Sequence, residues 1–212
     1  MDSDLIPINR MGKSTDLDFS VDLPSREAAD LRFALAVTRL LSPVTWHTLA
    51  GWASAKFLPT DEKGKKLQGL VRKGDFLRID IPGPGPRAGN GYDWVKVEIL
   101  EDHLDPLKEE EWIGLKVRPC PEPGKMESYP AHFFKQEASS TFIIKREGMK
   151  VTAFYHGRNE VPNTSTDKTL DNVRNAVVAA GALASFSELQ WESLNRGLLS
   201  PVNPNDLSPD GA

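Results

Sequence analysis

The sequence predicts an α+β fold, and three observations lead to this class. Residues 25–58 repeat apolar side chains every three or four positions, which is typical of amphipathic helices. Residues 70–160 hold short segments in which apolar and polar residues alternate, as in strands with one buried face. Residues 166–199 return to the helical period. We therefore expect an N-terminal helical pair, a twisted antiparallel sheet or small SH3-like barrel, and a long C-terminal helix packed on the sheet.

Composition indicates an ordinary soluble protein. The chain has 212 residues, 39% hydrophobic and 26% charged, with a net charge of −4. This length suits one domain with its own core, which we place at residues 25–200. Residues 1–24 show no sustained period and are expected to form a mobile arm, and residues 201–212 a disordered tail. The negative charge argues against bulk attraction to nucleic acid or to anionic membranes.

The cysteine and the apolar runs indicate a cytoplasmic protein. The one cysteine, Cys120, has no partner for an internal disulfide, and the four histidines lack the spacing of a metal site. The longest apolar run, residues 177–184, is far shorter than the ~20 residues that span a bilayer. The N-terminus lacks the apolar core of a secretory signal, although export without such a signal would leave no trace here. We expect no metal and no cofactor.

Two helices are expected in residues 25–58. Ser25 is a good N-cap for the first, which should end near Leu41. Ser42 and Pro43 begin the second, with the proline in the first turn, and Pro59 ends it. The first helix should bury Ala28, Leu31, Ala34, Leu35, Thr38 and Leu41, and the second Trp46, Leu49, Ala50, Ala53 and Phe57.

Residues 76–99 read as two strands around a loop rich in proline and glycine. An antiparallel register that buries the apolar set also pairs opposite charges outside. In that register the inner pairs are Ile81 with Val95, Ile79 with Val97 and Leu77 with Ile99, and the outer pairs are Asp80 with Lys96 and Arg78 with Glu98. The loop, residues 82–93, is not a phosphate-binding loop, because prolines lack the N–H donors and a strand rather than a helix follows.

Further strands follow this hairpin. Residues 112–118 alternate, with Ile113, Leu115 and Val117 inward and Trp112, Lys116 and Arg118 outward. A second hairpin over residues 141–155 puts Phe142, Ile144, Val151 and Ala153 on one face if Glu147 and Gly148 form a two-residue turn. That register places Lys145 opposite Lys150, so a three-residue bulged turn is the alternative.

The last helical pattern begins at a cap formed by Thr166 and Asp167. Its middle is rich in alanine and glycine, and a second capping pattern predicts a kink or break at residues 185–187. Small residues permit close packing either on the sheet or on a second copy of the helix. We favour the sheet, because a helix of a mixed domain needs one buried stripe.

The function expected first is a non-catalytic interaction or assembly module. The loop of residues 82–93 would present Arg87 and Tyr92 at its tip, while Trp94 and Trp112 on the outer strand faces would supply apolar contact area. The partner would be another protein or a second copy of the chain. Neither nucleic acid nor a membrane is the expected partner.

The first alternative is a small hydrolase-like enzyme. His156, Arg158 and Glu160 lie together where a strand is expected to end, a common place for residues that reach a ligand. The histidine could exchange a proton, the arginine could grip a carboxylate or phosphate, and the glutamate could orient the histidine or act as a base. The same residues are also typical of a surface turn. No nucleophile motif of the Gly-x-Ser-x-Gly type is present.

A weaker alternative is binding of nucleic acid or an acidic partner through residues 56–73. This segment holds six basic residues and only two acidic ones: Lys56, Lys63, Lys65, Lys66, Arg72 and Lys73 against Asp61 and Glu62. Such a run is equally typical of a solvated loop.

Overall fold

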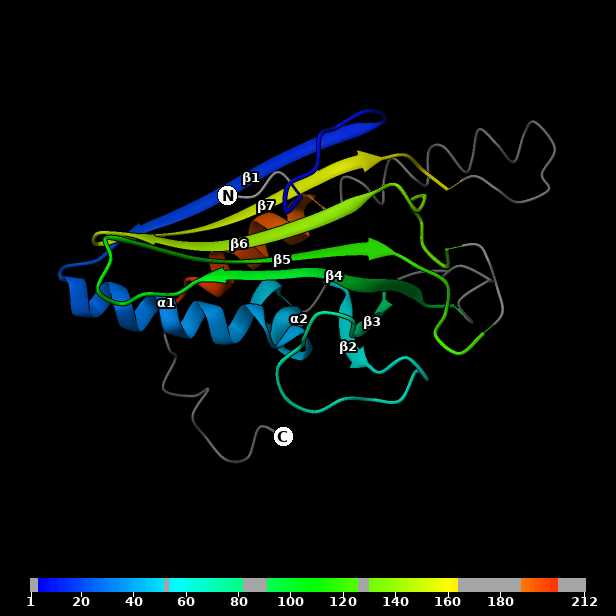
Figure 1. The fold of residues 1–212 in the computed structure, drawn as a ribbon, viewed down its shortest axis with the longest axis horizontal. Coiled ribbons are helices and arrows are strands. Elements are labelled where there is room, and N and C mark those ends of the chain that lie inside the picture. The colour runs from blue at the N-terminus through cyan, green and yellow to red at the C-terminus, as the bar shows by residue number, and fades with distance from the viewer. Residues whose placement is uncertain (1–3, 52–53, 82–90, 126–129, 164–187, 202–212) are drawn as a thin grey trace.

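The computed structural model describes residues 4–51, 54–81, 91–125, 130–163 and 188–201 (Figure 1). Seven antiparallel strands form one sheet in the order β1-β7-β6-β5-β4-β3-β2. The strands are β1 (Lys13–Asp22), β2 (Lys56–Thr60), β3 (Phe76–Asp80), β4 (Asp93–His103), β5 (Glu110–Pro119), β6 (Ser139–Glu147) and β7 (Lys150–Glu160). Because β1 and β2 are free edges, the sheet is open. The α+β class is confirmed, and the SH3-like barrel is wrong.

Helices cover one face of this sheet. They are α1 (Arg26–Leu40), the 3-10 helix η1 (Pro43–Thr45), α2 (Trp46–Ala50) and a helix over residues 188–198. Figure 1 shows the last of these, in orange and red, lying behind the strands. Phe33 of α1, Leu194 of the C-terminal helix and Leu115 of β5 belong to the same buried cluster, so the core lies between the helices and the sheet. No helix within the described ranges is long and apolar enough to cross a membrane.

The first helix has the predicted ends but a different buried face. The Ser25 side chain accepts a hydrogen bond from the Ala28 N–H at 3.2 Å, which confirms the cap. The buried residues are Ala29, Phe33, Ala36 and Leu40, whereas Leu31 of the predicted stripe is 74% exposed. The predicted face is therefore wrong. The buried face instead carries Phe33, whose large ring belongs to the main core cluster.

The second helix is shorter than predicted. It ends at Ala50, before Gly51, whose φ of 101° lies outside the helical region. Pro43 does occupy the first turn, but the Ser42 side chain makes no cap. Phe57 and Pro59 belong to β2, an edge strand, where a residue without an N–H is tolerated.

The β3–β4 hairpin keeps its predicted faces in a different register. Leu77 lies opposite Val95 rather than Ile99, a shift of four residues, so the predicted register and its charge pairs are wrong. An even shift keeps alternating side chains on their faces, and Leu77, Ile79, Val95 and Val97 are buried as predicted. The predicted inward place of Ile99 is wrong, because a bulge after Val97 sets Ile99 opposite Lys116 and Leu100 opposite Leu115. Exposed charge pairs stabilise a sheet too weakly to select its register. Instead, Glu98 binds Lys116 and Arg118 at 3.0 and 2.8 Å.

The β6–β7 hairpin also keeps its predicted faces in a register that differs from the predicted one. Glu147 lies opposite Lys150, so the turn residues are Gly148, with a φ of 58°, and Met149. The predicted turn and the pairing of Lys145 with Lys150 are wrong, since Lys145 lies opposite Thr152. The predicted faces of both this hairpin and β5 are confirmed by the burial of Phe142, Ile144, Val151 and Ala153, and of Ile113, Leu115 and Val117.

The N-terminal segment is ordered where an arm was expected. Residues 13–22 form β1, which pairs with β7. Before β1, Leu5 is fully buried against Gly114, where a side-chain Cβ would lie only 2.4 Å from the Leu5 Cδ2. The Thr141 hydroxyl donates to the Leu5 carbonyl at 2.9 Å. The expected arm thus covers the sheet face opposite the helices, and its alternation over Thr15, Leu17, Phe19 and Val21 was the missed signal.

The C-terminal helix is described only over residues 188–198. There it packs on the sheet, as expected, through Trp191, Leu194 and Leu198. The predicted cap, the small-residue middle and the break at residues 185–187 lie outside the described residues. So does most of the expected tail, from residue 202 onward.

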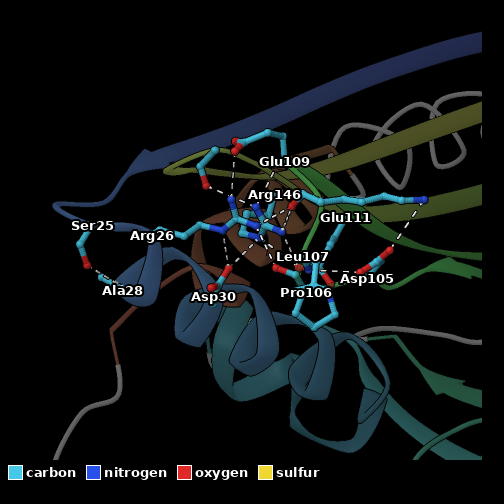
Figure 2. A network of polar contacts seen from close by, with 12 residues as sticks. Ser25, Arg26, Ala28, Asp30, Asp105, Pro106, Leu107, Glu109, Glu111 and Arg146 are labelled. Atoms are coloured by element: carbon cyan, nitrogen blue, oxygen red, sulfur yellow. Dashed lines mark hydrogen bonds and ion pairs between the residues drawn. The ribbon is translucent and has the colours of Figure 1, made fainter.

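A buried arginine joins α1 to the start of β5 and the end of β6 (Figure 2). Arg146 is 0% exposed, and its guanidinium contacts Glu111 Oε2 at 2.6 Å and Asp30 Oδ1 at 2.9 Å. It also donates to the carbonyl oxygens of Lys108 and Glu109. Arg26 of α1 shares the Asp30 carboxylate at 3.0 Å. We call Arg26, Asp30, Glu111 and Arg146 the arginine clamp.

Candidate functional site

A cavity lies between the helices and the inner face of the sheet. The space open to the centres of water-sized spheres is about 50 Å³, room for roughly four waters. Most of its walls are aromatic or aliphatic. They come from α2, the strands β2 to β6 and the C-terminal helix, and include Trp46, Phe57, Leu77, Val95, Val117 and Phe142. A concave, largely apolar space of this kind is where proteins hold small molecules.

One wall is a cluster of interlocked rings. Trp46 lies 4.9 Å from Phe142 and 5.1 Å from Phe57 between ring centroids. Trp191 lies 5.0 Å from Phe142 and stacks on Tyr155 at 5.2 Å. The Trp46 Nε1–H donates to the Arg39 carbonyl at 3.0 Å, so this ring has a fixed orientation. The wall is therefore rigid.

Another part of the wall comes from residues 132–134, which together with Ala131 form a segment that follows β5 in the chain. The Trp94 N–H donates to the Ala131 carbonyl at 2.7 Å, and the Phe133 N–H donates to Asp93 Oδ1 at 2.8 Å. Asp93 is buried, and burial raises the pKa of its carboxyl to about 7. We call residues 131–134 the mouth segment. Its place depends on a carboxyl group that titrates near neutral pH.

His132 of the mouth segment lines the cavity in its neutral form. Its ring is buried, and burial lowers the pKa of the imidazole to about 3. Nδ1 accepts a hydrogen bond from the Phe134 N–H at 2.9 Å. A neutral ring that accepts at Nδ1 carries its proton on Nε2. The Nε2–H has no hydrogen-bond partner in the part of the chain that the structure describes.

Gln190 and Trp191 bring two further donors from the C-terminal helix. Gln190 Oε1 accepts a hydrogen bond from the Ala55 N–H at 2.8 Å. This bond fixes the orientation of the side-chain amide, so its oxygen faces Ala55 and its NH₂ group does not. That NH₂ group bonds to no described residue. Trp191 Nε1 is also buried, and its N–H is directed at the Tyr155 hydroxyl oxygen. Both residues line the cavity.

A buried acid lies beside the cavity. The Tyr155 hydroxyl donates to Glu160 Oε1 at 3.2 Å and is 3.1 Å from the Ser140 hydroxyl, which lines the cavity. Thr15 donates to Glu160 Oε2 at 3.0 Å. Burial raises the pKa of Glu160. Its carboxylate fills the place where a side chain on Gly157 would stand, 2.4 Å from the ideal Cβ.

The structure separates the three predicted catalytic residues. His156 and Arg158 lie on the outer face of β7, where both contact Asp16 Oδ1, at 2.5 and 2.7 Å. Partial burial raises the pKa of Asp16, but the hydrogen bonds from Arg158 and His156 outweigh this effect, and the pKa is lowered overall. Glu160 instead reaches the inner face, because Asn159 has a φ of 55° that kinks the end of the strand. Glu160 therefore cannot orient His156.

The predicted partner-binding residues are not all exposed. Trp94 is 4% exposed and packs with Cys120 and Ala131, so its expected place on an outer surface is wrong. The chain that follows β5 covers this end of β4, which strand alternation alone cannot reveal. Tyr92 is half-buried under the Arg78 guanidinium at 4.3 Å, and Trp112 is half-buried with its ring parallel to that of His103. Arg87 lies outside the described residues.

The lysine-rich segment forms β2 and the connection to β3. The Asp61 carboxylate accepts hydrogen bonds from the Lys63 and Lys65 N–H groups, both at 2.9 Å, so it shapes the turn between them. Nucleic-acid binding by this segment stays a prediction. Within the described ranges, no group of three or more histidine, cysteine or acidic side chains is placed to hold a metal ion.

Sequence reasoning missed the polar residues of the cavity. Asp93 stands at an inward position of β4, two residues before Val95, so an acid on the buried face was a readable signal. His132 precedes two phenylalanines, and a histidine among apolar residues was a weaker signal of a buried polar group. For Gln190 and Ser140 we find no signal, because polar residues are ordinary in amphipathic elements.

Comparison with known proteins gives no family. No family of known proteins matches the sequence, and no characterised protein resembles it closely enough to be matched. Similar solved structures include an uncharacterised protein from Bacillus thuringiensis, with 10% identity, a TM-score of 0.39 and coverage of 89% of this chain and 100% of the other. A ginseng major latex-like protein from Panax ginseng has 13% identity, a TM-score of 0.38 and coverages of 84% and 99%.

A third such structure is a truncated norcoclaurine synthase from Thalictrum flavum. It has 11% identity, a TM-score of 0.31 and coverages of 87% of this chain and 96% of the other. At these TM-scores the likenesses carry no argument about what this protein binds or catalyses. The function has to be argued from the cavity itself.

Proposed function

We propose that the protein binds a small, largely apolar molecule in the cavity under the C-terminal helix. The observation that carries this proposal is an apolar space between the sheet and the helices that the side chains of the described residues leave unfilled. Protein interiors are normally packed to crystal-like density, and an unfilled space loses contact energy. An apolar ligand restores those contacts and leaves water, which favours binding.

The size of the cavity limits the ligand. About 50 Å³ of space suits a molecule of few atoms, and a ligand with a ring requires the mouth segment to move outward. Two hydrogen bonds tie this segment to β4, one of them to Asp93. Three more tie it to Cys120 and Asn163: the Ala131 N–H donates to the Cys120 carbonyl, and the backbone N–H and side-chain amide of Asn163 donate to the carbonyls of Phe133 and His132. A ligand with a ring would enter by breaking some of these bonds.

Binding can be tested with α-methylstyrene, a one-ring hydrocarbon, through the fluorescence of Trp46 and Trp191. Val117 lines the cavity, and Val117→Phe fills it, so we expect at least a roughly 10-fold loss of affinity. Ile113→Phe is the matched control, because Ile113 is buried on the same face of β5 without lining the cavity. It should lower stability and keep the affinity of the folded protein. Absence of saturable hydrocarbon binding would refute the proposal.

The functions expected from the sequence stay predictions. Protein binding by the loop of residues 82–93 depends chiefly on a segment outside the described residues, with Tyr92 and Trp112 as its remaining partly exposed aromatic residues. An enzyme built on His156 and Arg158 would have to use Asp16 in place of Glu160.

A further inference from the structure

The polar side chains of the cavity are unbalanced between donors and acceptors. His132 and Gln190 both line the cavity, and neither the His132 Nε2–H nor the Gln190 NH₂ group has a partner among the described residues. A buried donor without an acceptor costs roughly 1–3 kcal/mol. Native interiors rarely leave such groups unpaired, so two at one cavity indicate that something else supplies the acceptor.

The assignments of these donors are fixed by their other hydrogen bonds. His132 accepts at Nδ1 from Phe134, and Gln190 accepts at Oε1 from Ala55. Flipping either side chain would set a donor against a backbone N–H. The excess of donors therefore does not depend on how the rings and amide are oriented.

The cavity side chains have few acceptors to match them. Gln190 Oε1 is already used, and the Ser140 hydroxyl is the other side-chain oxygen among the described lining residues. Tyr155 donates to Glu160, so the Ser140 hydroxyl can donate to the Tyr155 oxygen. This contact holds the Ser140 side chain, and the Ser140 hydroxyl makes no hydrogen bond with the His132 Nε2–H.

We propose that the ligand of this cavity is a neutral apolar molecule with a carbonyl oxygen, which accepts a hydrogen bond from His132 Nε2–H. This inference rests on the proposed function and narrows it to one chemical class. The ring and aliphatic walls hold the apolar body of such a ligand, and the oxygen supplies what the donors lack. Ketones, esters and amides share this chemistry.

A negatively charged ligand fits the same donors less well. No lysine or arginine lines the cavity among the described residues, and the buried His132 ring is neutral. A carboxylate would enter an apolar space beside the buried acids Asp93 and Glu160 without a compensating cation. A carbonyl accepts the same hydrogen bond and carries no net charge.

The test compares acetophenone with α-methylstyrene, which replaces the carbonyl oxygen by a CH₂ group of similar shape. Two variants separate the roles of His132. His132→Asn keeps an acceptor near the position of Nδ1 for the Phe134 N–H and removes the Nε2 donor. His132→Gln keeps a donor near the position of Nε2 and gives up the acceptor.

We expect His132→Asn to weaken acetophenone binding roughly 3- to 10-fold and to leave α-methylstyrene binding unchanged. His132→Gln should weaken acetophenone binding less than His132→Asn does. In the infrared, the carbonyl stretch of bound acetophenone should lie at lower frequency in the wild type than in His132→Asn. A circular dichroism spectrum like that of the wild type shows that each variant is folded.

The outcomes separate the two proposals. If the hydrocarbon binds and His132→Asn leaves both the affinity for acetophenone and its carbonyl stretch unchanged, the carbonyl inference is overturned and the proposed function stands. If neither compound binds, both fail. If acetophenone binds and the variant weakens it together with α-methylstyrene to the same degree, His132 only shapes the mouth and the inference is again overturned.

Discussion

The arginine clamp and the cavity both hold buried polar groups, but they differ in whether those groups have hydrogen-bond partners. In the clamp, the Arg146 guanidinium has acceptors around it on every side, from Asp30, Glu111 and two backbone carbonyls. At the cavity, donors of His132 and Gln190 are left without acceptors among the described residues. Both regions lie under the same sheet, and burial is similar in both.

The difference teaches how a buried polar group can be assigned a role. A donor whose acceptors all come from the chain completes the fold, as Arg146 does by joining α1 to the ends of β5 and β6 (Figure 2). A donor that the chain leaves unpaired in an unfilled space is available to a ligand. Burial alone does not distinguish the two, but the count of partners does.

The largest effect is expected at the clamp. Arg146→Leu leaves Glu111 buried without a cation, which should lower the free energy of unfolding by about 3–5 kcal/mol. Urea denaturation followed by circular dichroism measures this. The double variant Arg146→Leu with Glu111→Leu is the control, and it should recover much of the loss because no charge is left unpaired. A loss below about 1 kcal/mol in the single variant would contradict the role of the clamp.

The next effect is the pH dependence of stability near the mouth segment. Burial raises the pKa of Asp93 from 3.8 to about 7, so this carboxyl ionises first in the unfolded chain, and its contribution to stability is lost as pH rises from about 4 to 7. Burial lowers the pKa of His132 from 6.5 to about 3, so its contribution is lost as pH falls through that range. The two slopes oppose each other.

Single variants should separate these slopes. Relative to the wild type, the free energy of unfolding of Asp93→Asn should gain roughly 1 kcal/mol per pH unit as pH rises from 4.5 to 6.5. Relative to the wild type, His132→Asn should lose a similar amount over the same range. Urea denaturation at several pH values measures both. Curves parallel to that of the wild type would show that neither group is buried as the structure has it.

The smallest effect concerns how the C-terminal helix is seated. A Cβ on Gly197 would lie 2.3 Å from the backbone carbonyl oxygen of Leu49, so Gly197→Ala must push this helix away from α2. We expect a loss of about 1–2 kcal/mol, although alanine is otherwise the better helix former. Because Trp191 is on the same helix, hydrocarbon affinity should also fall. Glu192→Ala, exposed on this helix, is the control and should change stability by less than about 0.5 kcal/mol.

Sequence periodicity predicted faces better than it predicted partners. Leu77, Ile79, Val95 and Val97 are all inward as expected, while the pairing of the two strands is displaced by four residues. Alternation distinguishes odd from even positions and cannot tell one even shift from another. The same limit explains the β6–β7 turn, which moved by one residue to Gly148 and Met149 without exposing the core.

The candidate site was less readable than the fold. His156, Arg158 and Glu160 are neighbours in the sequence, but the left-handed backbone at Asn159 sends Glu160 to the other face. Conversely, His132 and Gln190 are far apart in the sequence and line one cavity. Proximity along a strand is thus a poor guide to shared chemistry, since neighbouring side chains point to opposite faces.

By itself, the sequence determined the α+β class, the cap at Ser25 and the inward faces of β3 to β7, because these depend on local periodicity and backbone chemistry. Only the tertiary structure decided that Leu5 and β1 cover and extend the sheet and that Trp94 is buried. It alone placed at an apolar cavity the Nε2–H of His132, which has no partner among the residues that the structure describes. These features depend on contacts between residues distant in the chain, and no local pattern encodes which surfaces meet or which polar groups remain without a partner.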